Sequence, residues 1–399
     1  MTSRRTLLTG AAFAAALTVL VLSERALDRG LSAQADLVEA PMFEVDPRWP
    51  KPLPNGWLMG MAIGVGVDAE DHVWIVHRPD TLSANETAAA QDPKVAACCA
   101  AAPPVLQFDA EGNLISSWGG PGDGYDWPSS NHGITVDHKG IVWIGGNGAG
   151  DGHVLKFAQD GTFVAQYGRA GQTPDSNNTE HFGRVAKIFV DPQQNEAYLA
   201  DGYRNRRVAV IDADTGAFKR YWGAYGNKPD DTDIGTYVPG SPPAQQFRTP
   251  VHCAELSNDG LLYVCDRPND RVQVFTREGK FVREIFVAPK TMGDGSTWDI
   301  AFSKDPEQKY IFMADGKNEK IYVLLRETLE ILTMFGDGGR QPGQFFAVHS
   351  IATDSKGNIY TTETYEGRRL QKFVFTGIGR VPRVQGVVWP GRTASEPTP

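Results

Sequence analysis

A unit of short strands recurs six times along most of this chain, and the repetition limits the folds available to it. Each unit has an apolar strand, an Asp or Ser, a turn, a second strand ending in a polar loop, and outer strands of which several end in an aromatic residue and Gly. Self-similarity of this kind is the signature of a repeat architecture. The six copies begin at residues 61, 132, 186, 252, 298 and 349.

The turns place the six copies in one register. Four short antiparallel strands per copy, Asp-x-x-Gly turns and no helical periodicity predict an all-β, six-bladed β-propeller. The last copy has no obvious fourth strand, so we expect the early segment 42–49 to complete that blade. We assign residues 42–375 to the propeller and residues 376–399, rich in Pro, Gly and Arg, to a C-terminal tail. The turn-entry residues are Asp68, Asp137, Asp191, Ser257, Ser303 and Asp354.

Histidine occupies every second blade at one register position. The residues five places before each turn entry are Ile63, His132, Ala186, His252, Trp298 and His349. First strands line a propeller's channel, so we expect the three imidazoles to converge around one axis. Three histidines with an open fourth position bind catalytic Zn²⁺, and other divalent transition metals also accept imidazole. The alternative is that each histidine fills the channel mouth, bonded to backbone or water.

The second strands end on the same face as these histidines. Arg78 and Arg267 occupy matching places in two of the loops there, and Tyr203 lies in a third. Arginines beside a metal suit a small-molecule or peptide substrate that carries a carboxylate, which they can grip bidentately. The alternative for the arginines is a salt bridge to an Asp of their own loop. A tyrosine beside a cation and a metal can serve as a base, although packing is the usual role of such a residue.

The first residues indicate export rather than a part of the fold. Arg4 and Arg5 precede an apolar stretch, and a small-x-small cleavage pattern follows at 33–35, as in a twin-arginine signal. We expect residues 1–35 to be an export signal or an N-terminal anchor, and the protein to be periplasmic or secreted. The net charge of −9, without a basic cluster, argues against a nucleic-acid partner. A membrane contact is expected only through an uncleaved N-terminal segment.

Four cysteines leave the redox state open. Cys253 and Cys265 face each other across a predicted hairpin, which allows a cross-strand disulfide in an oxidising compartment. Cys98 and Cys99 lie in an Ala-rich insertion, residues 83–104, on the face that carries the histidines. The insertion is a candidate lid over the site.

The same segments resemble the catalytic domain of peptidyl-α-hydroxyglycine α-amidating lyase, a six-bladed propeller with NHL-like repeats. The likeness covers most of residues 55–375 and follows the family's order. "VWIVHRPD", "VDPQQNEAYLADGYRNRRV" and "DRPNDRVQVF" resemble its segments with the first active-site arginine, the catalytic tyrosine and the second arginine, which implies these roles for Arg78, Tyr203 and Arg267. "HGITVDHKGIVWI", "FRTPVHCAEL" and "QFFAVHSIATD" resemble its zinc-ligand segments. The implied zinc ligands are His132, His252 and His349.

Three departures from the family stand out. Ser350 follows His349 where the family has an Asp that helps to hold calcium, so a structural Ca²⁺ is doubtful. Arg204 and Tyr263 stand where the family has half-cystines. The copper monooxygenase partner that makes the family's substrate is absent from this sequence. We therefore expect the protein to share the family's scaffold and site residues but not its substrate.

The resemblance implies an exported, zinc-dependent lyase that cleaves a C–N bond next to a hydroxyl and a carboxylate. In it the metal and the arginines would hold the substrate, and Tyr203 would take the hydroxyl proton. Two alternatives stay open. One is a non-catalytic NHL-repeat propeller that binds a peptide or a wall component, and the other is a metal-dependent lactonase or other hydrolase that uses metal-bound water.

Overall fold

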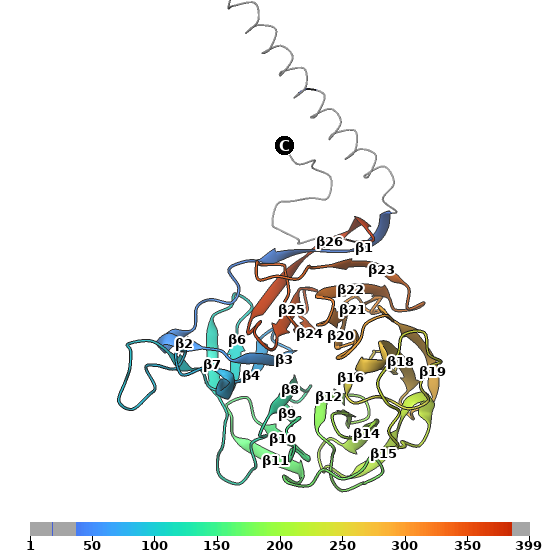
Figure 1. The fold of residues 1–399 in the computed structure, drawn as a ribbon, viewed down its shortest axis with the longest axis horizontal. Coiled ribbons are helices and arrows are strands. Elements are labelled where there is room, and N and C mark those ends of the chain that lie inside the picture. The colour runs from blue at the N-terminus through green and yellow to red at the C-terminus, as the bar shows by residue number, and fades with distance from the viewer. Residues whose placement is uncertain (1–17, 19–36, 385–399) are drawn as a thin grey trace, which may run out of the picture.

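Six four-stranded sheets form a ring around a central axis (Figure 1). The computed structural model describes residue 18 and residues 37–384. The prediction of an all-β, six-bladed β-propeller is confirmed. The first strand of each blade lies innermost, and the inner strands pack against one another around the ring. The centre of the molecule is thus lined by six equivalent strands.

In blades 1 to 5 the strands follow one another in sequence, and in all six blades neighbouring strands pair antiparallel. Blade 1 comprises β3 (Met61–Val67), β4 (Val73–Arg78), β6 (Val105–Phe108) and β7 (Leu114–Trp118). Blade 2 comprises β8 (Asn131–Val136), β9 (Val142–Gly146), β10 (His153–Phe157) and β11 (Phe163–Gly168). Blade 3 comprises β12 (Val185–Asp191), β13 (Glu196–Asp201), β14 (Arg207–Asp212) and β15 (Phe218–Trp222). Blade 4 comprises β16 (Val251–Leu256), β17 (Leu261–Asp266), β18 (Arg271–Thr276) and β19 (Phe281–Phe286). Blade 5 comprises β20 (Asp299–Phe302), β21 (Tyr310–Asp315), β22 (Lys320–Leu325) and β23 (Ile331–Phe335). Blade 6 comprises β24 (Val348–Thr353), β25 (Ile359–Glu363), β26 (Leu370–Pro382) and β1 (Leu37–Asp46).

Blade 6 combines the two ends of the described chain. β1 is its outermost strand and pairs with β26 from Leu37 opposite Pro382 to Asp46 opposite Lys372. The early segment thus completes the last blade. The boundary that we placed at residue 375 is wrong, because residues 376–382 continue β26. Their Pro, Gly and Arg content suggested a tail, but β1 supplies a partner for their backbone hydrogen bonds. The rest of the predicted tail, residues 385–399, lies outside the described residues.

Side-chain packing also holds β1 in the ring. Phe43 is buried, and its ring centroid lies 5.3 Å from that of Phe312, 5.6 Å from that of Phe335 and 5.8 Å from that of Phe375. Full burial of one such side chain contributes roughly 1.5–3 kcal/mol. The N-terminal strand is therefore anchored to blades 5 and 6 by an aromatic cluster as well as by its backbone.

The turn-entry aspartates organise the hairpins that set the register. Oδ1 of Asp137 accepts hydrogen bonds from the backbone of Lys139 and Ile141, and Oδ2 accepts one at 2.8 Å from Nε1 of Trp143. Asp68 and Trp74 repeat the aromatic contact at 2.8 Å. Each aspartate closes its turn and ties it to a buried aromatic ring on the second strand. This local device fixes the spacing between turn and inner strand in blades 1 and 2.

The insertion of residues 83–104 lies beside blade 1. Its end forms β5 (Ala100–Ala101), which pairs in parallel with β2 (Trp57–Leu58). In Figure 1 it extends outward from β2 rather than over the centre of the ring, so the lid that we expected is not present in this arrangement. Cys98 and Cys99 are bonded to each other, which leaves neither as a thiol ligand.

The second cysteine pair lies inside blade 4. Cys253 and Cys265 face each other across β16 and β17 and form the cross-strand disulfide that the hairpin allowed.

Loops of residues 37–384 carry the short 3₁₀ turns η1 (Pro54–Gly56), η2 (Pro79–Thr81), η3 (Ala224–Gly226) and η4 (Arg267–Asn269). In the described part of the chain no helix has the length and apolar character to cross a bilayer. The predicted export signal or anchor, residues 1–35, lies outside the described residues except for Thr18.

Candidate metal centre and active site

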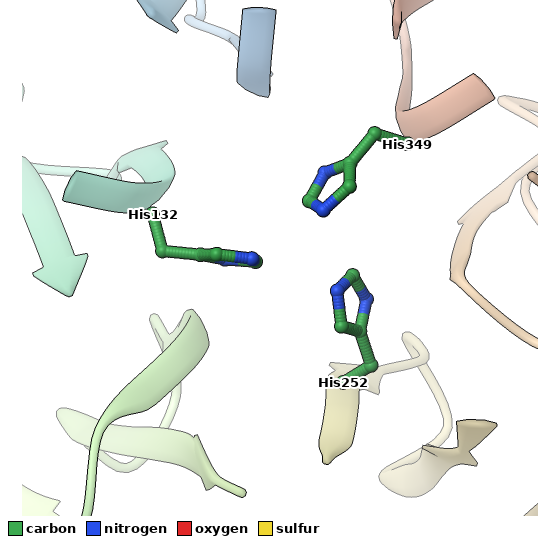
Figure 2. A group of neighbouring side chains, drawn as sticks. All are labelled: His132, His252 and His349. Carbon is green, nitrogen blue, oxygen red and sulfur yellow. The ribbon is translucent and has the colours of Figure 1, made fainter. Parts of the chain in front are cut away.

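Three histidines converge at the centre of the ring (Figure 2). His132, His252 and His349 are each the second residue of an inner strand, β8, β16 and β24, and each is buried. Their ring centroids lie 5.1, 4.8 and 4.8 Å apart, so the triangle is nearly equilateral. One nitrogen from each ring lies within 4.8 Å of the others. Their spacing on alternate blades thus becomes a three-fold cluster on the axis.

Each imidazole is fixed by a hydrogen bond to the next blade. Nδ1 of His132 lies 2.6 Å from the carbonyl oxygen of Ala186. Nδ1 of His252 lies 2.5 Å from that of Trp298, and Nδ1 of His349 lies 2.6 Å from that of Ile63. A carbonyl oxygen only accepts hydrogen bonds, so Nδ1 donates and Nε2 keeps its lone pair. The acceptors hold the same register position in the blades without histidine. Bonds of this kind orient metal-ligating histidines in general.

The three imidazoles are neutral at physiological pH. Burial lowers the pKa of His132 and His252 well below the ordinary value and that of His349 to about 3, and nearby guanidinium groups act in the same direction. Neutral imidazole is the form that binds Zn²⁺ and other divalent transition metals. Three such nitrogens can hold an ion and leave a fourth position for substrate or water. The donor set therefore fits a transition metal without selecting one.

Tyr203 places its hydroxyl directly at this cluster. Its Oη lies 2.9 Å from Nε2 of His132 and 3.1 Å from Nε2 of His252. The loop that carries it is held on one side by the fully buried ion pair of Asp201 and Arg207, with Oδ2 and Nε 2.7 Å apart. The chain therefore keeps a proton-carrying oxygen next to the nitrogens that would bind a metal.

Arg78 reaches the site from the end of β4. Its Nε and Nη2 donate to the carbonyl of Asn131 at 3.1 and 3.0 Å, and Nη2 also donates to Oδ1 of Asn147 at 2.8 Å. Burial lowers the pKa of Arg78, and the nearby Tyr203 opposes this. No salt bridge to Asp80 forms, so the loop salt bridge considered as an alternative is absent among the described residues. The hydrogen-bond partners of the guanidinium are therefore neutral, and its charge lies close to His132 and Tyr203.

Arg267, the first residue of η4, contacts Tyr203. Its Nη1 lies 3.5 Å from Oη of Tyr203, and its guanidinium lies 4.4 Å from the ring centroid of Trp298. Its nearest carboxylate is the half-exposed Asp294 at 3.7 Å, whereas Asp266 pairs with Arg271 instead. Six residues predicted from the sequence thus gather at one place: His132, His252, His349, Arg78, Tyr203 and Arg267.

Sequence reasoning missed several residues of this site. Asn147 orients Arg78 from a glycine-rich loop, and its only signal was its place at the end of a second strand. Trp298 occupies the histidine register position in blade 5 and had no predicted role. The guanidinium of Arg267 lies over its ring in a cation–π contact. Tyr365 lies within electrostatic range of Asp294, Arg267 and Arg78. No local pattern marks it.

A buried ionic network lies next to the histidines in the channel. Nζ of Lys187 lies 2.7 Å from Asp299 and 2.9 Å from Glu255, and Ser350 donates to the other oxygen of Asp299 at 2.7 Å. Burial disfavours the ammonium, but the two carboxylates outweigh it and raise the pKa of Lys187. Lys187 thus stays charged and is held by two carboxylates beside the three histidines.

Comparisons with known proteins give partial similarity to an enzyme and broader similarity to a repeat protein. No family model matches the chain. It is 33% identical over 156 residues to peptidyl-glycine alpha-amidating monooxygenase B of Xenopus laevis, a match that covers 39% of this chain and only 16% of that protein. It is 27% identical over 356 residues to NHL repeat-containing protein 3 of Mus musculus, with 84% and 85% of the two chains covered.

A solved structure supports the fold alone. A protein of unknown function from Bacteroides thetaiotaomicron VPI-5482 superposes with a TM-score of 0.51 at 12% identity, and the match covers 84% of this chain and 76% of that one. The chain is thus a six-bladed β-propeller that is similar to NHL repeat-containing protein 3 over most of its length and to the amidating monooxygenase over about two fifths of it.

Proposed function

We propose that the protein is a metal-dependent lyase that cleaves the C–N bond of an α-hydroxyglycine derivative. The observation that carries this proposal is the position of the Tyr203 hydroxyl, within hydrogen-bond distance of two ligand nitrogens and beside Arg267. A repeat propeller that only binds a partner needs no such phenol. The similarity of part of the chain to an amidating monooxygenase supports the same class of substrate.

The reaction can be written with its atoms and electrons in balance. A base takes the proton of the substrate hydroxyl, the C–O bond becomes a carbonyl, and the C–N bond breaks with its electron pair on nitrogen. The nitrogen then takes a proton, so an N-acyl-α-hydroxyglycine yields an amide and glyoxylate. A bound transition metal such as Zn²⁺ would act as a Lewis acid toward substrate oxygen.

The residues of the chain divide the remaining work. Tyr203 would take the hydroxyl proton. Arg78, held by neutral partners, would bind the substrate carboxylate by charge-assisted hydrogen bonds. Arg267, fixed on Trp298, would favour the deprotonated phenol through its positive charge.

We also propose that the protein works in the periplasm or outside the cell. The paired arginines near the start of the sequence and the Cys253–Cys265 disulfide support an oxidising compartment.

The test is turnover by Tyr203→Phe in metal-replete protein. Glyoxylate release from α-hydroxyglycine-ended peptides should fall by roughly 10²–10⁴, because general-base contributions have this size. Metal content and fold should be kept, since the histidines are untouched. Tyr221→Phe, which removes a hydroxyl bonded 3.2 Å from Asn177 far from the histidines, is the matched control and should turn over like wild type.

Two outcomes would favour other functions. Near-normal turnover in Tyr203→Phe would indicate a hydrolase that uses metal-bound water. Absence of turnover in the metal-replete wild type would favour a binding propeller.

A further inference from the structure

A cavity adjoins the histidine site at Arg267. Its volume is about 230 Å³, enough for roughly one amino-acid side chain. It lies between the long loop of residues 223–250 and the loop of residues 287–298, and Arg267 belongs to both the cavity and the histidine site. Its other charged lining residues are Arg206, Arg248, Asp233 and Asp294.

Two of its arginines come from segments that also build the site. Arg206 follows Tyr203 by three residues, and Arg248 precedes His252 by four. Arg206 donates to the carbonyl of Thr232 at 2.5 Å, and Arg248 donates to Oδ1 of Asn269 at 2.6 Å. Both guanidinium groups are thus held in place by neutral oxygens. Within the described residues, neither forms a salt bridge with a carboxylate.

The charge inside the cavity is positive. Three arginines face two aspartates, and Asp233 is exposed while Asp294 is 40% exposed, so solvent screens both acids. Burial lowers the pKa of Arg248, and the nearby charge of Arg206 lowers it further, although the carboxylate of Asp266 opposes them. Two neighbouring guanidinium groups that form no salt bridge with a carboxylate can still bind an anion.

We propose that this cavity binds a second anionic group of the substrate, on the amide side of the bond that breaks. This inference rests on the proposed function, and it narrows the substrate class to dianionic α-hydroxyglycine derivatives. The carboxylate next to the carbon that reacts would lie near Arg78 and the histidines. An acidic side chain or acyl terminus would extend past Arg267 to Arg206 and Arg248.

Binding of unreactive probes tests the cavity separately from turnover. N-acetyl-glutamyl-glycine and N-acetyl-glutaminyl-glycine lack the reacting hydroxyl and differ only in one side-chain charge. By titration calorimetry at low salt, metal-replete wild type should bind the glutamyl probe about tenfold more tightly, which corresponds to about 1.4 kcal/mol. Arg206→Gln and Arg248→Gln should each abolish most of this preference. Arg380→Gln, an exposed arginine on β26, is the control and should keep it.

A gain of binding guards against variants that merely misfold. Asp233→Asn removes an exposed negative charge from the lining and keeps an oxygen for the backbone N–H of Gly235. It should strengthen binding of the glutamyl probe by about two- to threefold and leave the glutaminyl probe unchanged. Equal affinity of wild type for the two probes, or no binding of either, would overturn the cavity assignment. Turnover of the corresponding α-hydroxyglycine peptides reports on the proposed function independently.

Discussion

His77, at the end of β4, gives a pH dependence of stability that can be worked out from its contacts. The ring is fully buried. Nε2 lies 2.9 Å from the carbonyl of Pro103 and can only donate there, whereas Nδ1 lies 3.2 Å from the backbone nitrogen of Gly60 and can only accept. Both contacts require the neutral imidazole. Burial accordingly lowers the pKa of His77 to about 4.

Acid should therefore destabilise the protein through this ring. In the unfolded chain the imidazole takes up a proton near its ordinary pKa of 6.5, whereas the folded protein resists protonation down to about 4. The unfolded state then binds more protons, so the stability present above pH 6.5 is lost as the pH falls through this interval. At about 1.4 kcal/mol per pH unit, the loss approaches about 3 kcal/mol.

The assay is urea unfolding of wild type and His77→Gln at pH 7.0 and pH 4.5. At pH 7.0 the variant should be less stable by about 1–3 kcal/mol, because one buried hydrogen-bonding group loses its partner. Glutamine does not titrate, so by pH 4.5 this difference should shrink or reverse by about 2.5 kcal/mol. His138→Gln, at an exposed position, controls for the substitution itself. An unchanged gap between wild type and His77→Gln at the two pH values would refute the reasoning.

Two further predictions concern the metal and export. Wild type should carry about one equivalent of transition metal by elemental analysis, and each His→Ala variant of the three-histidine cluster should lose it, because two imidazoles leave the ion short of ligands. Stoichiometric metal in all three variants would contradict the site. Replacing both Arg4 and Arg5 by Lys should leave the protein in the cytoplasm on cell fractionation, and an unchanged periplasmic yield would point to another export route.

The fold and the core of the site were predictable because both follow from local register. A turn-entry aspartate such as Asp137 fixes its hairpin through contacts within six residues, so the offset from the turn to His132 is constant and readable. The same logic placed Arg78 and Arg267 at the ends of second strands.

The features that the sequence did not predict depend on contacts between segments far apart in the sequence. Asn147 of blade 2 contacts Arg78 of the neighbouring blade 1, and Asp294 contacts Arg267 from a loop with no repeat pattern. The strand beyond residue 375 exists only because β1 pairs with it. The repeat pattern of the strands does not extend into the insertion. It therefore predicts neither the outward direction of the insertion nor the bond between Cys98 and Cys99.

The hydrogen bonds from each Nδ1 atom to the next blade have a consequence for the assembly of the ring. Blades 2, 4 and 6 supply the imidazole nitrogens, and blades 3, 5 and 1 supply the carbonyls that orient them, so every blade would contribute to the affinity for a metal on the axis. Metal binding and ring closure would then be thermodynamically linked, and such coupling is reciprocal. A bound ion would oppose separation of β1 from β26, and loss of that strand pairing would weaken metal binding.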